Sequence, residues 1–400
     1  MRIPRQSACL LLAFVMSTSA MAQTSEIQIT HGPYLQALTE TSVTIVWTTD
    51  KEAVSWVEYG TGGNFGSFPT YGGVVQTAQR SEHGLIEAFT TTHRITIGEL
   101  DAGQTYRYRV FSKHIQEFKP YEVAYGGSVA SDVLEFSTLD PEKVSFAFGV
   151  LTDIHGAGAR VDSVLGAMAL DELDLMFYTG DEIHYYEDDS QLFDGFVDVS
   201  VKHFASRLPM VYLRGNHETR GKYARRLMDY FPTQNGKFYY SFNHGPVHFI
   251  VLDSGEDKAD SHPVYAGLVD FDRYREEQAE WLERDMESEG FRNSTYQVAL
   301  FHIPPFGTRD AHGALHVRET WNDLLNRAGV DLVINGHTHR FARHDADELH
   351  HYPILINGQN TRARVDVSRG ELRVTVTGED GVVVDEFVIP AGGRAAAPGS

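Results

Sequence analysis

From residue 144 onward, short apolar runs alternate with longer amphipathic stretches, and this alternation restricts the possible folds more than any other feature of the chain. The apolar runs have the length and composition of buried strands, and they lie at 144–151, 175–179, 210–213, 247–252, 296–301 and 332–334. The amphipathic stretches have helical periodicity, and they lie at 157–172, 189–204, 271–288 and 317–328. Strands that alternate with helices in this way predict an α/β domain.

Five of the predicted strands are followed within a few residues by aspartate, histidine or asparagine. The side chains concerned are Asp153, His155, Asp181, Asn216, His217, His302, His337 and His339. In open α/β sheets the carboxyl ends of the strands form the crevice in which ligands bind. We therefore expect these side chains, which are far apart in the sequence, to converge on one site.

The predicted cluster contains five imidazoles, two carboxylates and one carboxamide, and it has no thiolate. Nitrogen and oxygen donors of this kind suit divalent Mn, Fe or Zn ions. Eight side chains are more than one tetrahedral ion can use, which indicates two ions that share a ligand. Asp153 and Asn216, taken singly, could instead be helix N-caps. A capping role does not explain the pair His337 and His339 directly after an apolar strand, so the pattern favours a metal site.

Residues 27–138 have the pattern of an all-β domain. Residues 42–49 alternate between two faces, as a half-buried strand does, and similar short strands follow. The stretch from Leu100 to Tyr106 is typical of the tyrosine corner of β-sandwich domains, in which the tyrosine hydroxyl bonds to upstream backbone. We therefore expect a fibronectin-type-III-like sandwich in front of the α/β domain.

Pro141 follows the last strand of this all-β region and marks a change of pattern. The predicted organisation is therefore a β-sandwich over 23–140, an α/β domain over 141–390 and a flexible tail over 391–400. Residues 1–22 have the three parts of an export signal: a basic start, a short apolar run at 9–16 and a small-residue cleavage site at 20–22. The apolar run is too short to span a membrane, so we expect a secreted or periplasmic protein with no stable membrane anchor.

The formal net charge of −21 argues against nucleic-acid binding, because proteins of that class carry a basic surface. An acidic surface also repels anions. A small phosphorylated substrate would therefore need a local cation to draw it into the site. The predicted metal cluster would supply that cation.

The motifs resemble those of a known superfamily in type and order. Asp153-x-His155, Gly180-Asp181, Gly215-Asn216-His217-Glu218, His302 and Gly336-His337-x-His339 are similar to the motif set of calcineurin-like metallophosphoesterases. The front half, notably residues 31–36 and 57–60, is similar to the N-terminal domain of purple acid phosphatases. The resemblance implies that the α/β domain consists of two mixed β-sheets flanked by helices.

The same resemblance implies a dinuclear-metal hydrolase of phosphate esters. Asp153, His155 and His339 would hold the first ion, Asn216, His302 and His337 would hold the second, and Asp181 would bridge both. A hydroxide between the two ions would attack phosphorus in line. His217 would protonate the leaving oxygen or stabilise the charge that develops on it.

Two positions depart from the purple acid phosphatase pattern. Those enzymes carry Asp-x-Gly at the first motif, where this chain has His155 in place of the glycine. They also place a tyrosine, whose charge transfer to ferric iron gives the purple colour, three residues after the bridging aspartate. That position is His184 here, and Tyr185 comes one residue later. We therefore expect a colourless or weakly coloured centre.

The front domain favours a phosphomonoesterase. The alternative is a phosphodiesterase acting on cyclic nucleotides or other diesters, because diesterases of the superfamily share Asp-x-His at the first motif. A further alternative is an inactive extracellular binding module, although every expected metal ligand is present. Arg220, just after the third motif, could meet a phosphate oxygen. His312 and His316 are expected in a loop beside His302, either near the substrate or in solvent.

Overall fold

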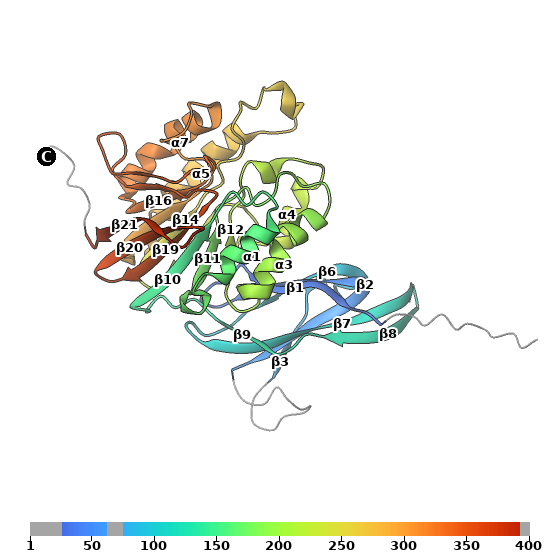
Figure 1. The fold of residues 1–400 in the computed structure, drawn as a ribbon. Coiled ribbons are helices and arrows are strands. Elements are labelled where there is room, and N and C mark those ends of the chain that lie inside the picture. Colours follow the sequence, from blue (N-terminus) through green and yellow to red (C-terminus); the bar gives the residue numbers. More distant parts are fainter. Residues whose placement is uncertain (1–25, 62–74, 393–400) are drawn as a thin grey trace, which may run out of the picture.

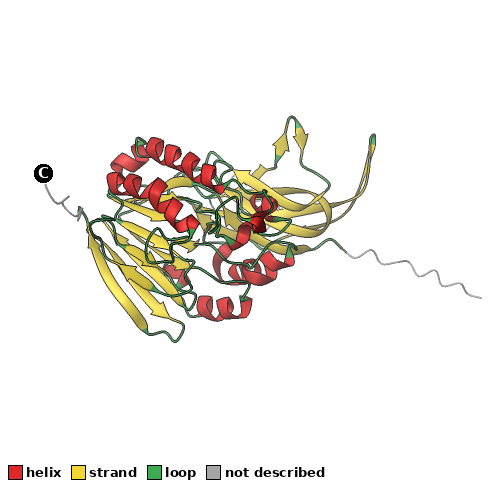
Figure 2. Cartoon of the chain, turned by 90° about the horizontal axis from the view of Figure 1, so that it is seen from above, coloured by secondary structure: helices red, strands yellow, loops and turns green. Residues whose placement is uncertain are grey.

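The computed structural model describes residues 26–61 and 75–392 and consists of an N-terminal β domain followed by an α/β domain (Figure 1). The export signal predicted at residues 1–22 lies outside the described residues, as does most of the predicted tail. In the described part of the chain the helices are confined to the second domain (Figure 2). This arrangement confirms the predicted fold class, an all-β domain in front of an α/β domain with mixed sheets.

The N-terminal domain is built around one long strand that takes part in both of its layers. Its main strands are β1 (Ile29–Gln36), β2 (Val43–Gly60), β3 (Gln76–Ala78), β6 (Thr90–Ile97), β7 (Thr105–Lys119), β8 (Glu122–Ala130) and β9 (Leu134–Ser137), and β4 (Ser81–Glu82) and β5 (Leu85–Ile86) form a separate hairpin. The first half of β2 pairs with β1 and β6, and its second half pairs with β3 and β7. The register shifts between Thr48 and Ala53, where the strand passes from one layer to the other.

Alternation along β2 fills the core of this domain. Val43, Ile45 and Trp47 are fully buried, and the Trp47 indole N–H donates to the Ser112 hydroxyl at 2.9 Å, which satisfies its one polar group. The predicted tyrosine hydrogen bond is present, because the Asp101 backbone N–H donates to the Tyr106 hydroxyl at 2.9 Å. This bond fixes the turn that leads into β7.

The second domain contains two six-stranded mixed sheets. The first has the strand order β12 (Met210–Tyr212), β11 (Leu175–Tyr178), β10 (Ser145–Leu151), β19 (Thr361–Ser368), β20 (Glu371–Gly378) and β21 (Val383–Pro390). The second has the order β13 (Tyr240–His244), β14 (Val247–Val251), β15 (Tyr296–Leu300), β16 (Leu332–Asn335), β18 (Ile354–Ile356) and β17 (Ala342–His344). Strands β10, β11 and β12 run parallel, as do β14, β15, β16 and β18, so their carboxyl ends lie at one edge of each sheet.

Helices cover the sheets. They are α1 (Gly158–Gly166), α2 (Ser190–Leu192), α3 (Asp198–Ser200), α4 (Leu227–Tyr230), α5 (Phe271–Asp285), α6 (Glu289–Asn293) and α7 (His312–Ala328). Helices α1 and α3 lie beside β10 to β12, and α5 and α7 lie beside the other sheet (Figure 1). Between α2 and α3 and after α3, residues 193–197 and 201–205 have π-helical hydrogen bonding, so residues 190–205 form one continuous helical stretch.

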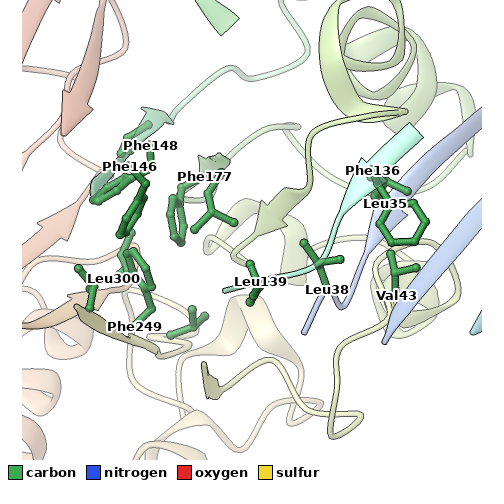
Figure 3. Close-up of a cluster of buried hydrophobic side chains, with 14 of the residues drawn as sticks. Leu35, Leu38, Val43, Phe136, Leu139, Phe146, Phe148, Phe177, Phe249 and Leu300 are labelled. Carbon is green, nitrogen blue, oxygen red and sulfur yellow. The ribbon is translucent and has the colours of Figure 1, made fainter. Parts of the chain in front are cut away.

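The two sheets pack face to face through aromatic side chains. The ring of Phe148 on β10 lies 5.3 Å from that of Phe249 on β14 in an edge-to-face arrangement, and Phe177 packs against both (Figure 3). The same apolar cluster continues into the N-terminal domain through Leu35 and Phe136 (Figure 3). The two domains therefore share one continuous core.

The N-terminal domain packs away from the carboxyl ends of the parallel strands. The Gln36 side-chain amide donates to the carbonyl of Met210, the first residue of β12, at 3.0 Å. The Tyr108 hydroxyl donates to the Ser206 carbonyl at 2.7 Å, just before that strand. These contacts lie at the opposite end of β12 from the predicted metal ligand Asn216, so they leave the carboxyl ends of the strands accessible.

Candidate metal centre

The carboxyl ends of five strands bring the predicted ligands together from both sheets. Asp153, Asp181 and Asn216 follow β10, β11 and β12 of the first sheet. His302 and His337 follow β15 and β16 of the second. The loops after these strands meet directly, because the backbone N–H of Asp153 donates to the carbonyl of Gly180 at 3.0 Å and that of Gly336 donates to the carbonyl of His302 at 3.0 Å.

The backbone of these loops is locally strained at the predicted ligands. Five of the predicted ligands have a positive φ, between 52° and 74°: Asp153, His155, Asp181, His337 and His339. Residues other than glycine seldom adopt this left-handed conformation, and it costs on the order of 1 kcal/mol at each position. The surrounding hydrogen bonds must therefore hold these side chains in directions that an ordinary strand end would not give.

The glycines of the motifs serve two different purposes. Gly180 has a φ of +99°, as expected for a sharp turn after a strand. Gly215 and Gly336 have no such φ and are required by close approach. A Cβ atom on Gly215 would lie 2.3 Å from the Asp181 backbone nitrogen, and one on Gly336 would lie 2.1 Å from the Thr152 hydroxyl. Only Gly180 therefore serves the turn itself, and the other two glycines are required by close packing.

Four side chains form a first group of candidate ligands: Asp153, His155, Asp181 and His339. Their ligand atoms all lie within 4.8 Å of one another. The Nε2 atoms of His155 and His339 are 3.0 Å apart, and His339 Nε2 is 3.4 Å from Asp153 Oδ1. Asp153 Oδ2 accepts the His337 backbone N–H at 2.9 Å, whereas Oδ1 is buried and has no hydrogen-bond partner among the described residues. An orphaned carboxylate oxygen that faces two imidazole nitrogens fits a bound cation.

A second group consists of Asp181, His302 and His337, with ligand atoms within 4.8 Å of one another. His302 Nδ1 lies 2.9 Å from the Thr179 carbonyl, which accepts its proton and leaves Nε2 free to face Asp181 Oδ2 at 3.0 Å. A terminal atom of the Asn216 carboxamide lies 3.1, 3.2 and 3.3 Å from His337 Nδ1, His302 Nε2 and Asp181 Oδ2. With its nitrogen there, the carboxamide can donate to His337 Nδ1 and Asp181 Oδ2, and with its oxygen there it completes a metal-ligand set.

Asp181 belongs to both groups and is fully enclosed. Burial by itself would raise the pKa of this carboxyl, but the neighbouring His302 and His217 hold it below its usual range. Asp181 is therefore an anion at the junction of the two groups. A carboxylate in this position can contribute one oxygen to each of two cations.

The protonation states of the imidazoles also suit metal binding. Burial lowers the pKa of His155 to about 3 and that of His337 to about 4, so both are neutral at physiological pH. His302 differs: burial lowers its pKa, but contact with Asp181 outweighs this effect and raises it to about 10. An ion that binds at His302 must therefore displace a proton. The donor set as a whole fits two divalent ions.

His217 lies outside the two groups that share Asp181, although with His155 and His184 it forms a third set of possible ligands, and its neighbours orient its ring. Its backbone N–H donates to Asp181 Oδ1 at 2.9 Å, and its ring Nδ1 donates to the carbonyl of His184 at 3.0 Å. Its Nε2 accepts a hydrogen bond from Arg220 Nη1 at 2.9 Å. Burial lowers the pKa of His217, so the ring is neutral in this arrangement.

Two carboxylates that support the site were not identified as supports from the sequence. Glu218 is buried and accepts four backbone N–H groups, from Asp181, Glu182, Ile183 and Gly215, at 2.6 to 3.1 Å. Burial raises the pKa of Glu218 to about 7, but four donors occupy both oxygens and fit only the ionised form. Glu256 pairs with Arg220 through both of its oxygens. Glu218 could have been suspected from its place in the third motif, whereas no pattern in the sequence distinguishes Glu256.

The remaining candidates lie at the edge of the site or away from it. His184 is exposed, and its ring stacks on that of His155 with 4.8 Å between centroids. Tyr185 is 48% exposed and belongs to none of the candidate ligand groups. His312 and His316 lie in the first turns of α7, which begins earlier than predicted, and not in a loop. His312 Nε2 bonds to Asp272 on α5 at 2.8 Å, so this histidine joins two helices.

Comparisons with known proteins identify two domains in this chain. Residues 146–341 match the calcineurin-like phosphoesterase family, and residues 32–138 match the N-terminal domain of purple acid phosphatases. The chain is 28% identical to Arabidopsis thaliana purple acid phosphatase 22 over 267 residues, which cover 63% of this chain and 53% of that protein. It is 26% identical to Arabidopsis thaliana purple acid phosphatase 18 over 318 residues, which cover 75% of this chain and 62% of that protein. The chain thus spans a little more than half of the length of these relatives.

No helix in the part of the chain that the structure describes combines the length and the apolar character needed to cross a membrane.

Proposed function

Because this chain carries a calcineurin-like phosphoesterase domain behind a purple acid phosphatase N-terminal domain, we propose that it hydrolyses phosphate esters at a centre of two divalent metal ions. The observation that carries this proposal is the shared position of Asp181. It is the one residue common to the group with Asp153, His155 and His339 and the group with His302 and His337. Two cations that share a carboxylate lie close enough to act on one phosphoryl group.

The metal ions, when bound, supply a nucleophile from water at neutral pH and withdraw charge from the phosphoryl oxygens. The chain itself holds and orients the groups around them. The Thr179 carbonyl fixes the ring of His302, and Glu218 ties the Asp181 loop to Gly215. His217 is the proposed catalytic residue, and its Nε2 lies 3.8 Å from Asp181 Oδ2. In its protonated form the ring can donate a proton from Nε2 to the oxygen that leaves phosphorus, or stabilise the charge that develops on it.

Phosphomonoesters are the proposed substrate class, with the matched N-terminal domain as support. Diesters are the second candidate, because His155 lies in the first ligand group, where purple acid phosphatases have a glycine. His339 is 47% exposed and His184 is also exposed, so the first-ion side of the site faces solvent. We further propose secretion or export to the periplasm, on the strength of the N-terminal sequence alone.

The test is a rate comparison on protein stripped with a chelator and restored with Mn²⁺. p-Nitrophenyl phosphate and bis-p-nitrophenyl phosphate are measured side by side. We expect metal-dependent release of nitrophenol, faster from the monoester. Faster turnover of the diester would replace the monoester assignment, and absence of turnover with metal bound, on these and on a panel of phosphorylated metabolites, would contradict the proposed function.

A further inference from the structure

The guanidinium of Arg220 is clamped along one edge by a buried carboxylate. Its Nε and Nη2 donate to the two oxygens of Glu256 at 2.8 and 3.0 Å. Glu256 is itself buried and also accepts the hydroxyls of Thr219 and Tyr265 at 3.1 and 3.0 Å. A planar guanidinium held by two parallel bonds is fixed in direction as well as in position.

The opposite edge of the same guanidinium faces the candidate metal centre. Nη1 donates to His217 Nε2 at 2.9 Å, and Nη2 lies 2.7 Å from the nearer terminal atom of the Asn216 carboxamide. A guanidinium has five N–H groups, and Glu256 and His217 use three of them. One N–H on Nη1 and one on Nη2 remain, and the Nη2 group is the one that lies beside the Asn216 carboxamide at the candidate site.

Arg220 also carries a permanent charge and can be reached from solvent. Burial lowers its pKa, but contact with Glu256 outweighs this effect, so that the pKa lies above its ordinary value. A third of the side chain, 33%, is exposed. On a chain with a net charge of −21, a fixed cation at the site attracts an anionic ligand that the rest of the surface repels.

Arg214, which lies six residues before Arg220, is also paired with a carboxylate but does not face the site. The guanidinium of Arg214 makes two bonds to the carboxylate of Asp253, at 2.6 and 2.8 Å. Its guanidinium, however, lies over the ring of Phe238 at 4.4 Å, and its side chain is only 14% exposed. Among the described residues, Arg214 makes no hydrogen bond or ion pair with a candidate ligand, whereas Arg220 contacts two residues of the predicted centre.

We propose that Arg220 binds a phosphoryl oxygen of the substrate, and of the phosphate product, beside the second ligand group. Glu256 acts as the positioning residue that holds the guanidinium in place. This inference rests on the proposed function, since it names a substrate-binding side chain of the same site. It adds a contact that none of the metal ligands provides.

The experiment compares metal-loaded wild type with Arg220→Ala, Arg220→Lys and Lys222→Ala. KM and kcat are measured for p-nitrophenyl phosphate, and binding of inorganic phosphate is measured by calorimetry. We expect Arg220→Ala to weaken phosphate binding and to raise KM by about ten- to hundredfold, the range for a hydrogen bond to a charged group, with unchanged metal content. Arg220→Lys should recover part of the loss, because a lysine supplies the charge without the fork.

Lys222→Ala is the matched control, because it removes an exposed cation two residues away. It should leave phosphate binding and KM unchanged. Arg220→Ala also leaves Glu256 buried without its partner, so the double variant Arg220→Gln with Glu256→Gln provides a version without a stranded charge. The double variant should show the same loss of phosphate affinity.

Three results would overturn the inference. The first is wild-type KM and phosphate affinity in folded Arg220 variants. The second is a fall in kcat alone, which would assign Arg220 to positioning His217. The third is loss of metal, which would assign it to supporting Asn216. If wild type binds phosphate through Arg220 but hydrolyses no ester, the proposed function fails while the binding role stands.

Discussion

Replacing Glu218 by glutamine should destabilise the metal centre without touching a metal ligand. In the structure each oxygen of Glu218 accepts two backbone N–H groups: Oε1 from Glu182 and Ile183, at 2.6 and 3.1 Å, and Oε2 from Asp181 and Gly215, each at 2.9 Å. A glutamine keeps one oxygen, so in either orientation its NH₂ group faces two N–H donors.

The magnitude follows from those two stranded donors. A buried N–H group that loses its acceptor costs about 1–3 kcal/mol, so Glu218→Gln should lower the free energy of unfolding by about 2–6 kcal/mol. That is a large part of the roughly 5–15 kcal/mol that is usual for a folded domain. The loops that carry Asp181 and Asn216 should also loosen, which should weaken metal binding.

Urea unfolding of the metal-free protein and a metal titration test this prediction together. Glu187→Gln is the matched control, because Glu187 is an exposed glutamate in the loop after β11, the loop that Glu218 holds through Glu182 and Ile183. The control should behave as wild type in both measurements. A Glu218→Gln protein that unfolds within about 0.5 kcal/mol of wild type and binds metal equally well would refute the reasoning, because surface substitutions alone give changes of that size.

Three further predictions concern the metal centre. Asp181→Ala should lose both ions and all turnover, whereas His217→Ala should keep both ions and lose turnover. Elemental analysis and a phosphatase assay measure these effects. An Asp181→Ala protein that retains two ions would contradict the assignment of Asp181 as the ligand shared by both ions. The pKa of His302, raised by Asp181 to about 10, predicts that the His302–Asp181 pair stabilises the metal-free protein fully below about pH 6.5 and less as the pH rises toward 10. Metal affinity should rise over the same interval because binding displaces that proton, and Zn²⁺ titrations from pH 6 to 9 that show a constant affinity would contradict this. Iron-loaded protein should have no strong visible band that depends on Tyr185, and a band abolished by Tyr185→Phe would show that this tyrosine coordinates iron.

The elements that sequence reasoning predicted well are those set by local pattern. Apolar runs such as 296–301 and 332–334 form the buried strands β15 and β16, because a short apolar segment bounded by turn residues has few other ways to bury itself. Polar residues at the ends of these strands then meet because parallel strands end at a common edge. Tyr106 likewise makes its predicted backbone bond, because its partner lies only five residues away.

The features that sequence reasoning missed depend on contacts between distant segments. Glu256 lies 36 residues from Arg220, in a loop without a repeated pattern, so nothing local indicates the pair. Gly215 and Gly336 must be glycine because atoms of other loops lie where a side chain would be, and these contacts exist only in the folded site. Helix α7 begins at His312, before the apolar periodicity is evident, and the contact between His312 and Asp272 on α5 joins segments far apart in the sequence.

The most direct test of the account is the number of metal ions per chain, measured together with turnover. Chelator-stripped protein is titrated with Mn²⁺, and bound metal and p-nitrophenyl phosphate hydrolysis are followed in the same samples. Two ions per chain, with turnover that appears only as the second ion binds, is the result we predict for two ligand groups that share Asp181. Saturation at a single ion, or full turnover in the presence of excess chelator, would contradict a dinuclear centre.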